Sequence, residues 1–134
     1  MSDLLIYREN NILIVNEILE LLNIDLSDTS ELERQVLACF AFGVLYATGK
    51  EKGFEPAQIH ALSIVNLQDS FNYSVEQAAD FSGFLVDVAS DEKLHKFMNA
   101  IIHCGINGYY QLNNRNYIAL TENIRNILSE IKKG

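Results

Sequence analysis

The chain has 134 residues, 49% hydrophobic and 21% charged, which is the composition of a folded globular protein and excludes an intrinsically disordered one. Its formal net charge of -8 arises from 18 acidic and 10 basic side chains. This balance argues against nucleic acid or an anionic membrane as the partner, because both are bound through Lys and Arg.

The first half of the chain predicts three helices. Across residues 3–22 the apolar side chains fall on one half of a helical projection. Ser30, with Glu33 three residues later, forms a capping box that begins a second helix. Pro56 suits the first turn of a third helix, which we expect to end near residue 69.

The second half predicts three more helices. Ser74 begins the fourth with a second capping box, and Ser90 or Asp91 is the expected N-cap of the fifth. Phe97 and Ile118 are among the apolar residues at helical spacing in the last two. No alternating pattern of useful strand length occurs, so the sequence predicts an all-α fold, a compact bundle of about six helices in a single domain over residues 1–134. The last three helices cover residues 75–89, a segment that ends near 112, and 117–132.

Two long segments contain acidic side chains and no Lys or Arg: residues 9–33 and residues 53–92, with seven acidic residues each. In the second segment, four acidic residues project within about 60° of one another if the fourth helix continues to Asp91. We call them the acidic stripe: Glu76, Asp80, Asp87 and Asp91. Like charges four residues apart are mildly unfavourable, so the stripe is either a solvated face that favours solubility or a docking face for a basic protein. It is too linear to predict a metal site.

The histidines predict no catalytic site and no metal site. His60 and His103 lie among apolar residues, and we expect both to be buried, hydrogen-bonded structural imidazoles. His103 adjoins Cys104, but neighbouring helical residues point about 100° apart and cannot form a nucleophile–base pair. A Cys/His enzyme would need the fold to bring His60 or His95 to a cysteine. We therefore predict a protein that is not an enzyme and needs no cofactor.

Glycine and tyrosine are concentrated in the fifth predicted helix. Gly105 and Gly108 each cost about 1 kcal/mol relative to alanine inside a helix. They either permit close approach of another helix or partner, or end the helix with a positive φ. Tyr109 and Tyr110 follow, either as half-buried core residues or as anchors in an interface.

Cys39 and Cys104 both lie inside apolar stretches and have no ligand-like spacing. Free, buried and reduced thiols are typical of a cytoplasmic protein. The first residues have no basic start or cleavage site of a signal peptide, and no apolar run is long enough to span a membrane. We therefore expect a cytoplasmic location without membrane attachment.

The order FAFGVLYATGKEKGFEPAQIHALSIVNLQDSFNYSVEQAADF, then AIIHCGINGYYQL and a closing helix, resembles the small all-helical immunity proteins of bacterial polymorphic toxin systems. The greatest similarity is to the family of immunity protein 48. Residues 40–110 carry this resemblance, and residues 1–35 contribute little. The matching positions are Phe42, Gly43, Pro56, His60, Gln68, Asp69, Glu76, Gln77, Ala78, His103, Gly105, Ile106, Gly108 and Tyr110.

The resemblance implies a protein that binds and neutralises a cognate toxin domain, encoded by a neighbouring gene, in the cytosol of the producing cell. Toxins that attack nucleic acids often have basic clefts, which an acidic protein can fill. The alternative is an acidic adaptor, or a nucleic-acid mimic that inhibits an endogenous protein. We expect the partner-binding residues to be the acidic stripe with Asp69, Tyr109 and Tyr110, and the structural or family-motif residues to be His60, Gln68, His103, Gly105 and Gly108.

Overall fold

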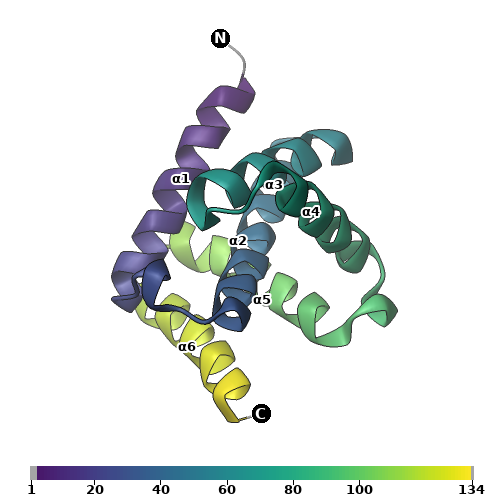
Figure 1. Ribbon diagram of the computed structural model, residues 1–134. Helices are drawn as coiled ribbons and strands as arrows, with labels where there is room; N and C mark the ends of the chain where they lie inside the picture. Colours follow the sequence, from purple (N-terminus) through teal and green to yellow (C-terminus); the bar gives the residue numbers. More distant parts are fainter. Residues whose placement is uncertain (1–2, 134) are drawn as a thin grey trace.

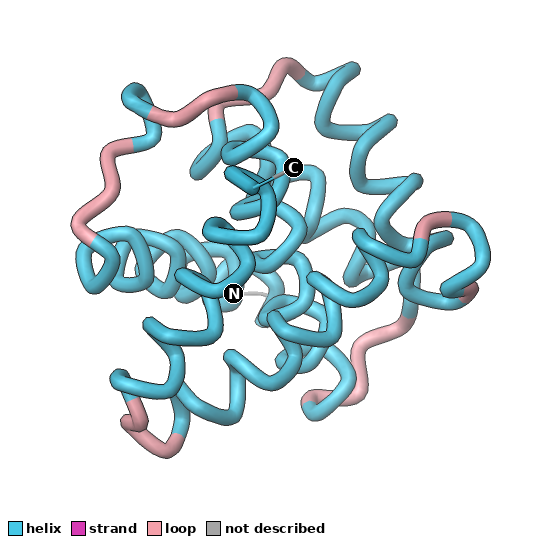
Figure 2. The backbone as a smooth tube through the Cα atoms, turned by 90° about the horizontal axis from the view of Figure 1, so that it is seen from below, coloured by secondary structure: helices cyan, strands magenta, loops and turns pink. Residues whose placement is uncertain are grey.

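The computed structural model describes the backbone of residues 3–133 and the side chains of residues 6–131, and the described part forms six α-helices and no strand. This confirms the predicted all-α fold. The helices are joined by short loops and lie against one another at varied angles rather than as a parallel bundle (Figures 1 and 2). Their bounds are α1 Asp3–Leu22, α2 Glu31–Glu51, α3 Pro56–Phe71, α4 Val75–Ser90, α5 Lys96–Asn113 and α6 Tyr117–Lys133, with two 3₁₀ turns, η1 Leu26–Asp28 and η2 Glu92–Leu94.

Both predicted capping boxes are confirmed. Ser30 Oγ accepts a hydrogen bond from the backbone of Glu33 at 3.1 Å, and Ser74 Oγ accepts one from the backbone of Gln77 at 3.1 Å. The two N3 side chains accept a hydrogen bond in return from the backbone of each cap. Pro56 occupies the first turn of α3, where its missing N–H leaves no helical hydrogen bond unmade.

The prediction that Ser90 or Asp91 caps the fifth helix is wrong. α4 ends at Ser90, and Asp91 has an extended backbone with φ -146°. The Asp91 carboxylate accepts a backbone hydrogen bond within η2, which intervenes between α4 and α5. The N-cap of α5 is His95, whose Nδ1 accepts from the backbone of Met98 at 3.2 Å.

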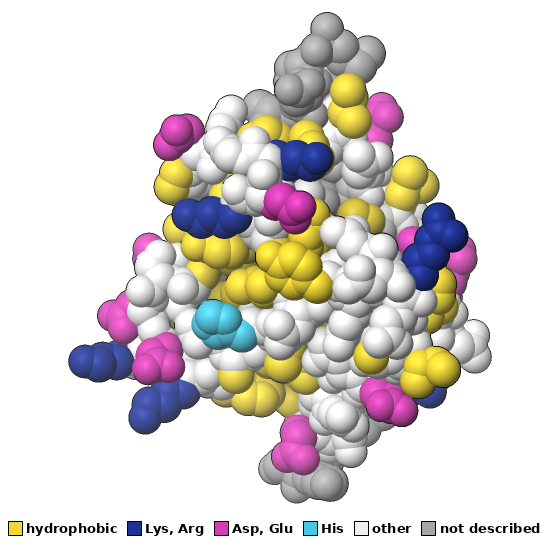
Figure 3. All heavy atoms as spheres, turned by 180° about the vertical axis from the view of Figure 1, so that it is seen from behind, with side chains coloured by type: hydrophobic (Ala, Val, Ile, Leu, Met, Phe, Trp, Pro, Cys, Tyr) yellow, Lys and Arg dark blue, Asp and Glu magenta, His cyan; other side chains and the backbone are white. Residues whose placement is uncertain are grey.

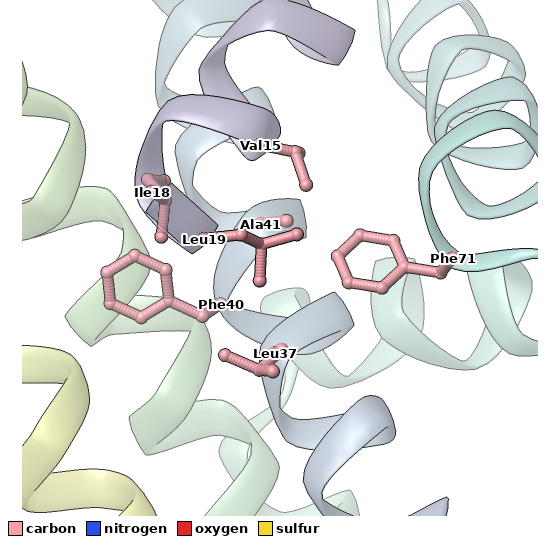
Figure 4. Close-up of a pocket in the computed structure, with 7 residues that line it drawn as sticks. All are labelled: Val15, Ile18, Leu19, Leu37, Phe40, Ala41 and Phe71. Carbon is pink, nitrogen blue, oxygen red and sulfur yellow. The ribbon is translucent and has the colours of Figure 1, made fainter. Parts of the chain in front are cut away.

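α2 forms the centre of the core. Every residue from Val36 to Leu45 is buried, so this helix has neighbours on all sides. Side chains from α1, α2 and the end of α3 point toward one another around a cavity of about 10 Å³, with Phe40 and Phe71 on opposite sides of it (Figure 4). Its lining is apolar and it has room for about one water-sized sphere, so it is a packing defect and not a ligand site.

α2 and α5 approach so closely that their backbones meet at Gly43 and Gly105, and the ring of Phe40 on α2 packs against Gly108 on α5. A Cβ built on Gly43 would lie 2.8 Å from the Cα of Gly105, and one on Gly108 would lie 2.5 Å from Cζ of Phe40. Neither Gly105 nor Gly108 has a positive φ. Of the two roles left open by the sequence, close helix approach is therefore the correct one.

Two of the apolar residues at helical spacing in the last two helices are exposed. Ile118 is 76% exposed because it lies two residues, or about 200°, from Leu120, which with Ile124 forms the buried side of α6. Phe97, 41% exposed, lies in the first turn of α5 and lines a groove between α5 and α6. Helical spacing alone did not fix which side of these helices faces the core.

Candidate partner-binding surface

Three residues of the acidic stripe share the solvent side of α4. Glu76, Asp80 and Asp87 are exposed, while the opposite side of the helix is buried against α3 and α5. Asp91 is also exposed, but it lies beyond the end of α4, so the predicted continuation of the stripe to Asp91 is wrong. None of the four is in an ion pair among the described residues, where the two ion pairs are Arg8–Asp69 and Arg34–Glu31.

An exposed aromatic ring interrupts the stripe. Phe84, 39% exposed, follows Asp80 by one helical turn and precedes Asp87 by almost another. Beside it lies a groove of about 390 Å³ between the N-terminal part of α2 and α4. We call this the aromatic groove; its lining residues are Glu31, Gln35, Tyr73, Gln77, Asp80, Phe81 and Phe84.

The Glu31 end of the aromatic groove already holds a cation of the chain itself. The guanidinium of Arg34 lies 4.3 Å from the centre of the Tyr73 ring and donates to Glu31 at 2.6 Å. The hydroxyl of Tyr73 also donates to Glu31, at 3.4 Å. Burial, and then the negative charge of Glu31, raise the pKa of Tyr73. Glu31 is thus compensated, whereas Asp80 has no described cation beside it.

The sequence predicted the acidic residues of this surface but not its aromatic residues. A signal for Phe84 was present, because positions 76, 80, 84 and 87 fall on one side of a helix. Tyr73 could not be found in this way, because it lies in the loop before α4 and meets Glu31 across 42 residues of sequence. On the opposite face of the molecule from Figure 1, basic and acidic side chains are mixed, and apolar side chains gather near the middle (Figure 3).

The other predicted partner-binding residues lie outside the aromatic groove. Asp69, on α3, is exposed and accepts from Nε of Arg8 on α1 at 3.0 Å. Tyr109 is 7% exposed and lines a second cleft, of about 510 Å³, between α1, α2 and α5. Burial, followed by a hydrogen bond to Glu51, raises the pKa of Tyr109. Tyr110 is 53% exposed, so only Tyr109 is a core residue, and the interface role of Tyr110 stays a prediction.

The family-motif histidines also divide. His60 is half-buried, and its Nδ1 lies 2.9 Å from the hydroxyl of Ser82, which joins α3 to α4. Ser82 is fully buried, so this contact links the two helices inside the protein, but His60 itself is not fully buried, contrary to the prediction. The prediction that His103 is buried is wrong: Ile102 faces the core, and the next side chain points about 100° away into solvent. Gln68 is half-buried on α3.

The cysteines are not arranged as nucleophiles. Cys39 is buried and its thiol donates to the carbonyl of Met98 at 3.4 Å, whereas Cys104 is only half-buried, contrary to the prediction. Burial raises the pKa of both thiols, which disfavours the reactive thiolate. Across the described residues, no three His, Cys, Asp or Glu side chains are placed to hold a metal ion, and no helix has the length and apolar character to cross a membrane.

Comparison with known proteins identifies a family. The model of a family described as immunity protein 48 matches residues 7–132. The match includes α1, which contributed little to the resemblance seen in the motifs. No curated protein and no solved structure gives a significant match.

Proposed function

The chain belongs to the immunity protein 48 family, and we propose that it neutralises a cognate bacterial toxin by binding the toxic domain with the exposed side of α4. The family match is the observation that carries this proposal. Immunity proteins generally act without catalysis, so inhibition depends on occupying the toxin and not on turnover. We propose that the complex forms in the cytoplasm of the cell that produces the toxin.

The charge of the α4 side supports its role in binding. Glu76, Asp80 and Asp87 are exposed and lack ion-pair partners among the described residues. A basic partner would remove their mutual repulsion and would be attracted over long range, which can raise association rates by about 10- to 1,000-fold at low salt. A toxin that acts on nucleic acid or nucleotides has the basic cleft that such a surface fits.

Apolar contacts on the α4 side would supply binding energy that charge alone does not provide. Binding energy at interfaces is concentrated in a few buried aromatic or arginine anchors surrounded by a polar rim. Phe84 is an exposed aromatic residue with Asp80 and Asp87 on either side along α4. This arrangement favours the interpretation of the α4 side as a docking face over its interpretation as a solvated acidic face.

Co-expression tests the proposal. The product of the neighbouring gene is expected to arrest growth when expressed alone and to be tolerated when this protein is co-expressed. The two proteins should then co-purify as a complex. A neighbouring product that is harmless, or toxic but not rescued, contradicts the proposal; purification with a chromosomal housekeeping protein instead would favour the acidic adaptor.

A further inference from the structure

We propose that the aromatic groove receives an arginine side chain of the toxin, with Asp80 as its charge partner; this inference rests on the proposed function. Tyr73, Phe81 and Phe84 supply three aromatic rings along the groove, and Asp80 supplies a carboxylate. The rings of Tyr73 and Phe81 meet edge to face with centroids 5.8 Å apart. The groove thus combines a π-rich wall with an uncompensated negative charge.

The charge of Asp80 decides what kind of side chain can cover the groove. Covering Asp80 with an apolar group would remove water from a carboxylate and provide no hydrogen bond in return, which is unfavourable. A second acidic group would add repulsion. A cation replaces the hydrogen bonds that the carboxylate loses from water with charge-assisted hydrogen bonds. The groove therefore favours a basic side chain.

The rings and the carboxylate of the groove favour arginine over lysine. A guanidinium is planar, stacks on aromatic rings and donates in a fork that matches a carboxylate, whereas an ammonium is a strongly hydrated point charge. Gln35 donates its Nε2 to Glu31 at 3.3 Å, which leaves its Oε1 as a further acceptor for the guanidinium. One side chain of the partner can therefore use a ring, a carboxylate and an amide oxygen together.

Arg34 shows that this chemistry already operates at the groove. Its guanidinium lies over Tyr73 and pairs with Glu31, in the same ring-and-carboxylate combination. Because Arg34 compensates Glu31, an incoming arginine is directed to the Asp80 end, where Phe84 is exposed. The partner's arginine would thus repeat the intramolecular contact across the groove, on α4 instead of α2.

Titration with a small probe tests the groove without the toxin. Nuclear magnetic resonance spectra of the protein are recorded with N-acetyl-arginine amide and with the matching citrulline amide, which has a similar shape and no charge. We expect saturable shifts confined to Tyr73, Phe81, Phe84 and Asp80 with the arginine probe only. Equal shifts with both probes, or arginine shifts spread over the acidic surface, would overturn the inference.

Single substitutions distinguish the groove from general attraction. Asp80→Asn should weaken binding of the arginine probe by about tenfold or more, the worth of a hydrogen bond to a charged group. Asp87→Asn is the matched control, since it removes the same charge from the same side of α4 but does not line the groove. Equal weakening by the two substitutions contradicts the proposal.

The toxin separates this inference from the proposed function. If the toxin binds the wild-type protein and Asp80→Asn with the same affinity, the groove assignment fails and toxin neutralisation stands. If the arginine probe binds in the groove but no neighbouring toxin is neutralised, the proposed function fails. The groove then binds arginine, but the assignment of that arginine to a toxin fails as well. Loss of toxin affinity in both Asp80→Asn and Phe84→Ala supports both.

Discussion

The crossing of α2 and α5 gives a prediction that can be worked out from distances. In Gly105→Ala, the new Cβ would lie 2.9 Å from the Cα of Gly43 and 3.1 Å from the carbonyl carbon of Phe40. Carbon atoms in contact are normally about 3.5–4.0 Å apart. Because both neighbours are backbone atoms, no side chain can rotate away, and the two helices must separate by an amount on the order of 1 Å.

The expected cost follows from two opposing terms. Overpacking a close-packed core costs about 1–3 kcal/mol, and a clash with backbone belongs at the upper end. Alanine recovers about 1 kcal/mol of helix propensity relative to glycine. We therefore expect Gly105→Ala to lower the free energy of unfolding by about 2 kcal/mol.

Gly83→Ala is the matched control for Gly105→Ala. Gly83 is also inside a helix, but the nearest atom to a Cβ built on it is Cε1 of His60 at 4.0 Å, an ordinary contact. Only the propensity term applies, so this substitution should raise the free energy of unfolding by up to about 1 kcal/mol. Urea unfolding followed by circular dichroism measures both. If Gly105→Ala is as stable as the wild type, the close crossing is not a constraint on the fold.

Two further predictions concern side chains whose pKa is raised by burial. In the folded protein a thiol reagent should modify Cys104 slowly and Cys39 only on unfolding, because Cys39 is fully buried; faster reaction of Cys39 would contradict its placement. The raised pKa of Tyr109 means that the folded state holds this proton more tightly than the unfolded state. Its contribution to stability is therefore fully present below the ordinary tyrosine pKa of about 10 and is lost as the pH rises through the folded value. Unfolding of Tyr109→Phe across this alkaline range should show a smaller loss of stability than the wild type; an unchanged loss would place the effect elsewhere.

Local signals in the sequence were sufficient to predict where three of the helices begin. The capping boxes at Ser30 and Ser74 set the starts of α2 and α4, and Pro56 set the start of α3, because each acts within one helical turn. The η2 turn was missed because three residues are too few for a hydrophobic period. Its presence moved the cap of α5 from Asp91 to His95.

The candidate site needed information that the sequence does not contain. Helical projection correctly placed Glu76, Asp80 and Asp87 on one exposed side, but whether a side faces solvent or a partner depends on the rest of the fold. His103 was expected to be buried from the apolar character of its neighbours, whereas its direction on α5 decides its exposure. The contact of Tyr73 with Glu31 depends on tertiary packing alone.

The measurement that tests the central claim most directly is the affinity of the toxin for a double charge reversal on α4. Asp80→Lys with Asp87→Lys is compared with Glu9→Lys with Glu20→Lys, which gives the same net charge through exposed residues of α1. We expect the α4 double variant to bind far more weakly, with less dependence on salt, and to be as stable as the wild type or slightly more stable. The α1 double variant should retain most of its affinity. Equal affinity of the α4 double variant and the wild type would show that the stripe is only a solvated face.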